Sequence, residues 1–247
     1  MSVKNRNSIV TDGLVFYVDA GNADSYAGSG TTWTDLVGGN DGTLEPALGP
    51  TYDSANGGSI VFDGADDYAT TNYSSLFSDI NGGMSINFWI KTTATARQSV
   101  LGAFNDGFTT GGRVYINADS SGGAATNTGN IGWWCRDDSA NKLSFSADCD
   151  VQDGNWHNIT ITISGTSSSD IKIYNNSSSQ TVTIGNSAFD KTDASLLTHY
   201  VWLGAENSRG SVSQPFDGSL ACVSFYNKVL SAAEVLQNYN ALKGRFD

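Results

Sequence analysis

The chain has 247 residues, a formal net charge of −12 and only 15% charged residues. A surface this acidic, with no stripe of lysine or arginine, argues against nucleic acid as a partner and against insertion into or binding to anionic membranes. Aromatic residues make up 11% of the chain and recur along its length, which excludes a disordered protein and fits one large all-β domain.

The chain begins with a polar arm, which we assign to residues 1–12, and continues as a single domain over residues 13–247. Gly13–Asp19 is expected to be the first strand, with apolar side chains on both faces. The glycine- and serine-rich residues 20–58 are expected to form a long surface loop, anchored by a few apolar side chains such as Trp33.

The clearest strand is Met84–Lys91, in which every second residue, beginning with Met84, is apolar. Further strands are expected at Ser99–Phe104, Arg113–Asn117, Ile131–Cys135, Lys142–Ser146, Trp156–Ile163, Ile171–Tyr174, Thr181–Ile184, Tyr200–Gly204 and Leu220–Tyr226. A spacing of roughly 8–15 residues, with turn residues between the strands, indicates an all-β, antiparallel two-sheet sandwich.

One short helix is expected, near the C-terminus. Ser231 is a favourable N-cap, and Glu234 three residues later completes a capping box. An apolar face follows, and Gly244 suits the C′ position, one residue beyond the C-cap. We expect this helix to dock against the sandwich.

The three cysteines, Cys135, Cys149 and Cys222, are an odd number and do not suggest a disulfide framework. Each lies in or beside an apolar strand, which favours buried thiols in a protein that folds in a reducing cytosol. The first ten residues contain no apolar run, so we expect no export signal.

Three blocks of sequence resemble the laminin-G-like branch of the concanavalin A-type lectin and glucanase superfamily. They are Phe62–Tyr68 followed by Ser85–Lys91, Asp153–Ile159 followed by Ile171–Tyr174, and Leu203–Gly204 with Phe216–Gly218 and Val223–Val235. The resemblance implies a two-sheet jelly roll closed by one short C-terminal helix. In this superfamily the same frame serves sugar binding, adhesion or catalysis, so the fold does not decide the function.

The two ends of the domain, Gly13–Trp33 and Leu236–Phe246, are similar to laminin-G-like modules in virion proteins of tailed bacteriophages. This resemblance implies a protein made in the host cytoplasm and located in the virion. Such an origin would also account for the missing export signal and the odd number of cysteines.

Catalysis is not expected. Glycoside hydrolysis requires two carboxylates about 5–10 Å apart, and glucanases that resemble this fold carry two glutamates on one strand. The only glutamates, Glu45, Glu206 and Glu234, are far apart in the sequence. The histidines, His157 and His199, have no nucleophile near them in the sequence, and we expect His157 to face the core with its ring nitrogens bonded.

No cofactor is expected apart from a structural calcium ion, which the resemblance implies at the rim of the sandwich. Asp63, Asp66 and Asp67 are the candidate ligands, since calcium prefers oxygen atoms. The acidic residue that the family usually carries after its second Phe-Asp-Gly corner is replaced here by Ala221 and Cys222. The alternative is that the three aspartates only stabilise a tight turn.

Sugar binding requires an exposed aromatic ring with polar groups beside it. Alternation sends Trp133 inward and Trp134 outward beside Arg136, so Trp134 is the candidate platform, with Asn105 and Asp106 in a neighbouring loop as hydrogen-bonding partners. The alternative is that both indoles pack between the sheets or at a subunit interface.

These observations favour a non-catalytic bacteriophage virion protein, either a capsid decoration or a tail-fibre-associated adhesin. Its expected partners are other virion proteins, further copies of itself, and a glycan of the host surface bound weakly at each site. A bacterial carbohydrate-binding module and a degenerate glucanase are the alternatives. An export signal would favour the module, and a pair of neighbouring glutamates would favour the enzyme.

Overall fold

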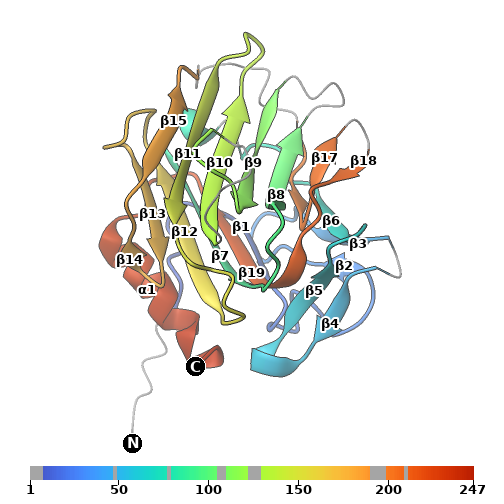
Figure 1. Ribbon diagram of the computed structural model, residues 1–247. Coiled ribbons are helices and arrows are strands. Elements are labelled where there is room, and N and C mark those ends of the chain that lie inside the picture. The colour runs from blue at the N-terminus through green and yellow to red at the C-terminus, as the bar shows by residue number, and fades with distance from the viewer. Residues whose placement is uncertain are drawn as a thin grey trace, which may run out of the picture.

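Alternating apolar side chains give the chain two antiparallel β-sheets that face each other across one core (Figure 1). The computed structural model describes residues 8–46, 49–76, 79–104, 110–121, 129–189, 199–208 and 211–247. This architecture confirms the all-β sandwich with one short C-terminal helix.

The first sheet has eight strands, of which the long strand β19 pairs with three others. In spatial order they are β14 (Ser178–Ser179), β13 (Ile171–Asn175), β12 (His157–Ile163), β7 (Met84–Lys91), β19 (Asp217–Tyr226), β5 (Ser59–Asp63) and β4 (Thr51–Asp53), with β1 (Leu14–Asp19) paired to β19.

The second sheet has nine strands and lies in front in Figure 1. In spatial order they are β15 (Thr183–Ser187), β11 (Lys142–Asp148), β10 (Asn130–Arg136), β9 (Gly111–Ile116), β8 (Gln98–Phe104), β16 (Trp202–Leu203), β6 (Tyr68–Thr71), β3 (Gly42–Glu45) and β2 (Thr32–Trp33). A separate hairpin, β17 (Glu206–Ser208) with β18 (Ser211–Ser213), packs against β8.

The core lies between the inner faces of the two sheets, as the alternation in Met84–Lys91 predicts. Ile86 and Phe88 of β7 are fully buried there, with Trp133 of β10 and Phe145 of β11 from the opposite sheet. The rings of Trp133 and Phe145 are parallel, with their centroids 6.0 Å apart. Trp133 therefore points inward, and the next residue, Trp134, must point outward.

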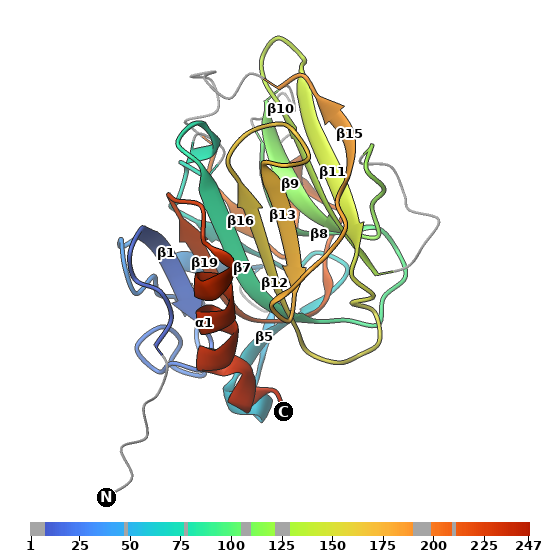
Figure 2. The same ribbon diagram turned by 90° about the vertical axis from the view of Figure 1, so that its left-hand side faces the viewer.

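Helix α1 (Ala232–Leu242) covers the outer face of the first sheet (Figure 2). Its capping box is present as predicted, because Ser231 and Glu234 each accept a hydrogen bond from the other's backbone N–H. The indole of Trp89 on β7 stacks against Tyr239 of the helix, at a centroid distance of 5.7 Å. The outer face of the first sheet is thus closed by the helix.

Gly244 occupies the predicted C′ position, because α1 ends at Leu242 and Lys243 is its C-cap. The helix continues directly into a 3-10 turn, Lys243–Arg245, and Gly244 lies inside that turn. The turn places Phe246 against Trp89, with ring centroids 4.2 Å apart. Gly244 thus continues the turn and does not form a left-handed glycine cap, and Phe246 packs the end of the chain against the sheet.

The interpretation of residues 20–58 as a surface loop is also wrong in part. The stretch contributes the short strands β2, β3 and β4, and Trp33 of β2 is completely buried in the core. The sequence does not indicate these strands, because each is only two to four residues long and lies among glycine residues, which are rare in strands.

Part of the N-terminal segment is bound to the C-terminal helix. The backbone N–H of Val10 donates to Asn238 Oδ1 at 2.8 Å, and the hydroxyl of Tyr226 donates to the Val10 carbonyl at 3.1 Å. No helix in the described part of the chain is long and apolar enough to cross a membrane.

All three cysteines are buried free thiols. Burial raises the pKa of Cys135 and of Cys149 to about 12, and it also raises the pKa of Cys222. Since the thiolate is the reactive form, these groups behave as small core side chains and not as nucleophiles.

Candidate functional site

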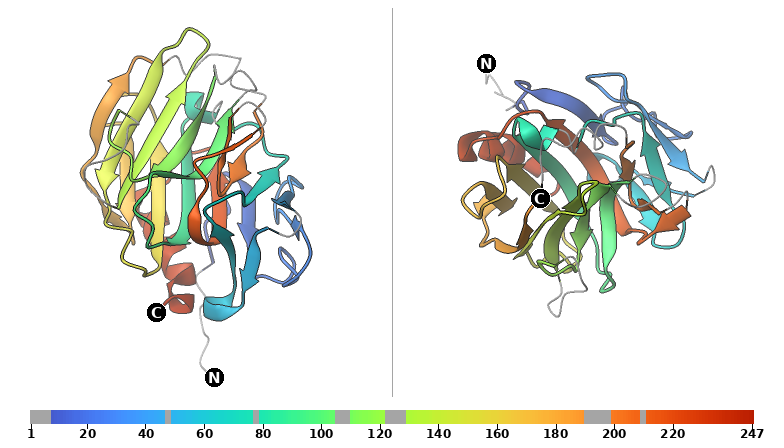
Figure 3. Two further views of the ribbon diagram at one scale, coloured as in Figure 1. Left: turned by 45° about the vertical axis from the view of Figure 1, so that its right-hand side comes forward. Right: turned by 90° about the horizontal axis from the view of Figure 1, so that it is seen from above.

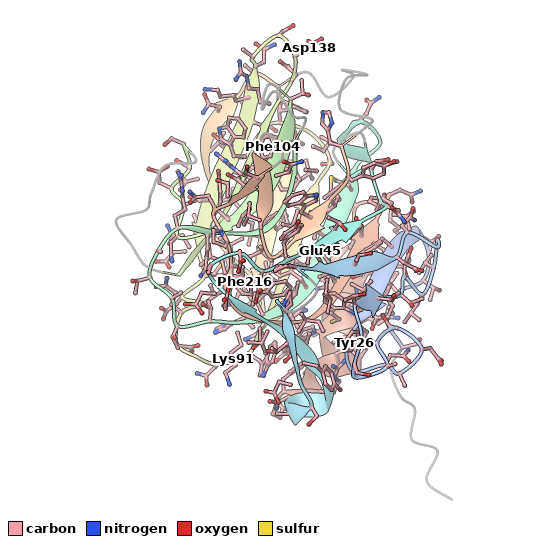
Figure 4. The ribbon with its side chains drawn as sticks, turned by 90° about the vertical axis from the view of Figure 1, so that its right-hand side faces the viewer. Tyr26, Glu45, Lys91, Phe104, Asp138 and Phe216 are labelled. Carbon is pink, nitrogen blue, oxygen red and sulfur yellow. The ribbon has the colours of Figure 1, made fainter. Side chains whose placement is uncertain are left out.

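The outer face of the second sheet carries the predicted residue Trp134. Register places Trp134 on β10 directly opposite Arg113 on β9 and Ser144 on β11. The neighbouring row on the same face contains Phe104 of β8, Arg136 of β10 and Lys142 of β11. Figure 4 shows Phe104 on this part of the molecule, below the β10–β11 turn that carries Asp138.

Arg113 is the centre of an aromatic cluster on this face. Its guanidinium carbon lies 4.3 Å from the ring centroid of Tyr115, 4.9 Å from that of Trp134 and 5.4 Å from that of Phe104. A cation held over aromatic faces is attracted by the ring quadrupole. The cluster therefore fixes the orientation of the Trp134 indole.

Arg113 also forms a buried ion pair with Glu206 of β17. One guanidinium nitrogen, Nη1, donates to Oε1 and Oε2 of Glu206 at 2.8 and 2.6 Å. Burial raises the pKa of Glu206 and lowers the pKa of Arg113, while the partner charge acts in the opposite direction on each. The ion pair holds the β17–β18 hairpin on β8, where a side chain at Gly102 would collide with Glu206.

Trp134 itself is half-buried, so part of its indole contributes to the surface. Phe104 lies beside it with a centroid distance of 6.0 Å, and the ammonium of Lys142 lies 6.0 Å from its ring centroid. The alternative that Trp134 packs between the two sheets is therefore wrong. The other predicted partners, Asn105 and Asp106, lie outside the described residues.

A second aromatic pair on the same face was not anticipated from the sequence. Ala69 and Leu203 point into the core, so their neighbours Tyr68 and Trp202 lie on the outer face. Their rings stack with centroids 4.3 Å apart. Both residues lie in very short or irregular strands, where alternation gives no clear signal.

The three predicted calcium ligands do lie together. Carboxylate oxygens of Asp63, Asp66 and Asp67 are all within 4.8 Å of one another at the end of β5. Two of these carboxylates already serve the turn, since Asp67 accepts from the backbone of Asp63 and Asp63 accepts from that of Ala65. The oxygens suit calcium chemically, but three carboxylates are fewer ligands than the six to eight oxygens that calcium takes.

Replacing Asp67 with asparagine is expected to raise the melting temperature by about 2 °C at neutral pH. Burial, with a smaller contribution from Asp63 and Asp66, raises the pKa of Asp67. A raised pKa in the folded state contributes stability at acidic pH that is lost as the pH rises through that pKa. The two proteins should therefore converge in stability at acidic pH.

Thermal unfolding followed by circular dichroism at several pH values tests this prediction, with Asp24→Asn as the control, because Asp24 is exposed and lies outside this cluster. A lower melting temperature for Asp67→Asn at neutral pH would contradict it. If calcium binds, added calcium should raise the melting temperature of the wild type more than that of Asp67→Asn.

Two of the three glutamates have structural roles, in the Arg113 ion pair and in the capping box of α1. Both ring nitrogens of His157 have partners at 3.0 Å, Asn175 Oδ1 and Asp153 Oδ1. His199 Nε2 lies 2.7 Å from Thr110 Oγ1. The geometry thus gives these residues structural roles.

A pocket of about 180 Å³ lies at the end of β7, away from Trp134. Its lining residues are Lys91, Thr92, Thr93, Gly154, Asp217, Gly218 and Ser219. Small-molecule sites usually enclose about 300–1,000 Å³. The half-buried side chains of Trp134, Arg136 and Lys142 are therefore the stronger candidate for a binding surface.

Similar proteins were found by sequence and by structure. Residues 63–236 match the family model for the concanavalin A-like lectin/glucanases superfamily. No sequence among the curated proteins matches the chain.

Among solved structures, the receptor-binding domain of botulinum neurotoxin C/D mosaic serotype is 15% identical, with a TM-score of 0.62 over 93% of this chain and 51% of that one. The binding domain of Paraclostridial Mosquitocidal Protein 1 is 16% identical, with a TM-score of 0.62 over 93% of this chain and 52% of that one. This chain spans about half the length of these toxin domains.

Domain 4 of AbnA, an extracellular arabinanase of Geobacillus stearothermophilus, matches over nearly its whole length. It is 13% identical, with a TM-score of 0.59 over 92% of this chain and 98% of that domain, and its structure was solved in complex with arabinotriose. At these identities the structural matches show a shared fold, while the family model covers most of the sequence. The chain belongs to the concanavalin A-like lectin/glucanases superfamily.

Proposed function

We propose that this protein is a non-catalytic glycan-binding module that serves as an adhesion component of a bacteriophage particle. The observation that carries the glycan-binding part is the half-buried Trp134, oriented by Arg113 and Phe104 on the outer face of the second sheet. An indole held in this way offers a rigid apolar surface beside polar groups, which is what a sugar ring requires.

The family also supports glycan binding. One structural relative was solved with a bound arabino-oligosaccharide, and others are receptor-binding domains of toxins. Because α1 covers the outer face of the first sheet, the corresponding face of the second sheet is the better placed for a ligand.

The virion assignment rests on the resemblance of two segments, Gly13–Trp33 and Leu236–Phe246, to phage modules. In the structure these segments meet, because Arg245 binds Asp19. The two segments are therefore joined by this ion pair, and we propose that the surface around it attaches the protein to other virion proteins.

Replacing Trp134 with alanine is expected to weaken glycan binding by about tenfold or more, since exposed aromatic anchors dominate binding energy. Polysaccharides and glycan arrays should be screened with the wild type first, and the affinity of each ligand then measured for Trp134→Ala. Trp156→Ala is the matched control, because Trp156 is half-buried against Phe246 on the side of the first sheet. Loss of binding in Trp156→Ala but not in Trp134→Ala would refute this location of the site.

Attachment to the particle is tested by mixing purified protein with phage particles that lack it. Incorporation without any added glycan would support the virion role. Failure to join particles, together with tight binding of the monomer to one polysaccharide, would favour a bacterial carbohydrate-binding module instead.

A further inference from the structure

Two cations face each other beside Trp134 on the outer face of the second sheet. Arg136 of β10 and Lys142 of β11 are directly opposed in the antiparallel register, and both are half-buried. Like charges directly opposite each other on one face of a sheet repel and destabilise the pair. A negative charge near the pair would reduce this repulsion.

The described residues supply no ion pair for either cation. Their ion pairs to arginine or lysine involve Arg113, Lys228 and Arg245, and none of the described carboxylates lies within ion-pairing distance of Arg136 or Lys142. In addition, Nε of Arg136 is buried and has no hydrogen-bond partner among the described residues. Arg113, in contrast, is neutralised by Glu206.

This arrangement is unusual for a protein with a net charge of −12. Three cations, Arg113, Arg136 and Lys142, lie next to one indole, and among the described residues only Arg113 has an ion-pair partner, Glu206. The row that holds Arg136 and Lys142 ends in Phe104, and Gly111 between Phe104 and Arg136 contributes no side chain. In the described part of the chain, the row beside Trp134 thus carries two half-buried cations without an ion-pair partner, which suits an anionic ligand.

We propose that Trp134, Arg136 and Lys142 form a subsite for an acidic sugar, which carries a carboxylate or a sulfate. The indole would stack on the sugar ring, while the guanidinium of Arg136 and the ammonium of Lys142 bind the anionic group. Arginine forms paired, charge-assisted hydrogen bonds with carboxylate and sulfate oxygens. The inference rests on the proposed glycan binding and specifies its ligand class.

The acidic surface elsewhere on the protein should confine an anionic glycan to this subsite. A polyanionic chain is repelled by most of an acidic protein and attracted only where positive charge is concentrated. Binding to an acidic glycan should therefore weaken as salt is added, whereas stacking on a neutral sugar should depend little on salt.

The test compares polymers with the same backbone and different charge: dextran with dextran sulfate, and methyl-esterified polygalacturonate with polygalacturonate. Affinity electrophoresis or calorimetry at low and physiological ionic strength should show that the wild type prefers one or both acidic polymers. The two pairs distinguish a sulfate ligand from a carboxylate ligand.

Three variants complete the test: Arg136→Gln, Lys142→Gln and the double substitution. The double variant should lose the preference for the acidic polymer by about tenfold or more, with little change in affinity for the neutral one. Lys172→Gln is the matched control, because Lys172 is an exposed lysine on β13 of the other sheet. Removing either member of the like-charge pair should leave the melting temperature unchanged or raise it, which separates loss of binding from loss of folding.

Retention of the acidic preference by the double variant would overturn this inference. If Trp134→Ala still abolishes binding in that case, the proposed glycan-binding face stands and only its ligand class is wrong. Absence of wild-type binding to every polymer and glycan would overturn both proposals.

Discussion

Replacing Arg245 with alanine is expected to lower the free energy of unfolding by about 3 kcal/mol. Arg245 Nη1 donates to Asp19 Oδ1 and Oδ2 at 2.8 and 3.0 Å, and the Asp19 side chain is only 8% exposed. Without Arg245 the carboxylate would remain buried without its counter-charge, which costs more than the loss of a surface ion pair. Arg245 also donates to the carbonyls of Asn56 and Gly58, so the turn before β5 would lose contacts as well.

Urea unfolding followed by tryptophan fluorescence measures this effect. Lys243→Ala is the control, because Lys243 lies in the same 3-10 turn and none of the described ion pairs includes it. Equal stability of the two variants would mean that the ion pair between Arg245 and Asp19 contributes no more to stability than an exposed ion pair does. Adding Asp19→Asn to Arg245→Ala should recover part of the loss, since it removes the buried charge.

Replacing Arg113 with methionine is expected to cost a similar amount, about 3 kcal/mol. Glu206 is 2% exposed, and the substitution would leave its buried carboxylate without its ion-pair partner, with the charge of Arg97 as a weaker influence. Burial already raises the pKa of Glu206, and loss of the guanidinium would raise this pKa further. The variant should therefore regain stability as the pH falls through the raised pKa, because protonation removes the buried charge.

A double-mutant cycle gives the sharpest test of this second effect. Glu206→Gln combined with Arg113→Met should be much more stable at neutral pH than Arg113→Met alone, because an amide needs no counter-charge. Urea unfolding at neutral and mildly acidic pH provides the measurement. Strict additivity of the two substitutions would mean that the ion pair has no energetic coupling.

The sequence predicts those features that depend on near neighbours. Alternation in Met84–Lys91 identifies which side chains enter the core, and the same period of two separates Trp133 from Trp134. Ser231 and Glu234 predict the start of α1 because the capping box is completed within four residues. Each of these signals is local in the chain.

Features that depend on distant pairing could not be predicted in the same way. Arg113 and Glu206 are 93 residues apart, and nothing in either segment indicates that β17 folds over β8. Lys142 faces Arg136 only because of the β10–β11 register, which is set by the turn between them. The clustering of the cations around Trp134 could therefore be identified only from the structure of the sheet.

The pairing of the two ends of the domain has a consequence for how the protein folds. Val10 binds Asn238, β1 pairs with β19, and Asp19 binds Arg245, so contacts span more than 200 residues of sequence. Proteins rich in such non-local contacts fold slowly, on a scale of milliseconds to seconds, because chain entropy is lost before the contacts form. During synthesis, β1 must wait for its neighbour β19, and the edge of β7 stays uncovered until then. An uncovered strand edge of this kind can pair with another chain, so we expect aggregation during synthesis to be the main hazard for this fold, whatever ligand the finished domain binds.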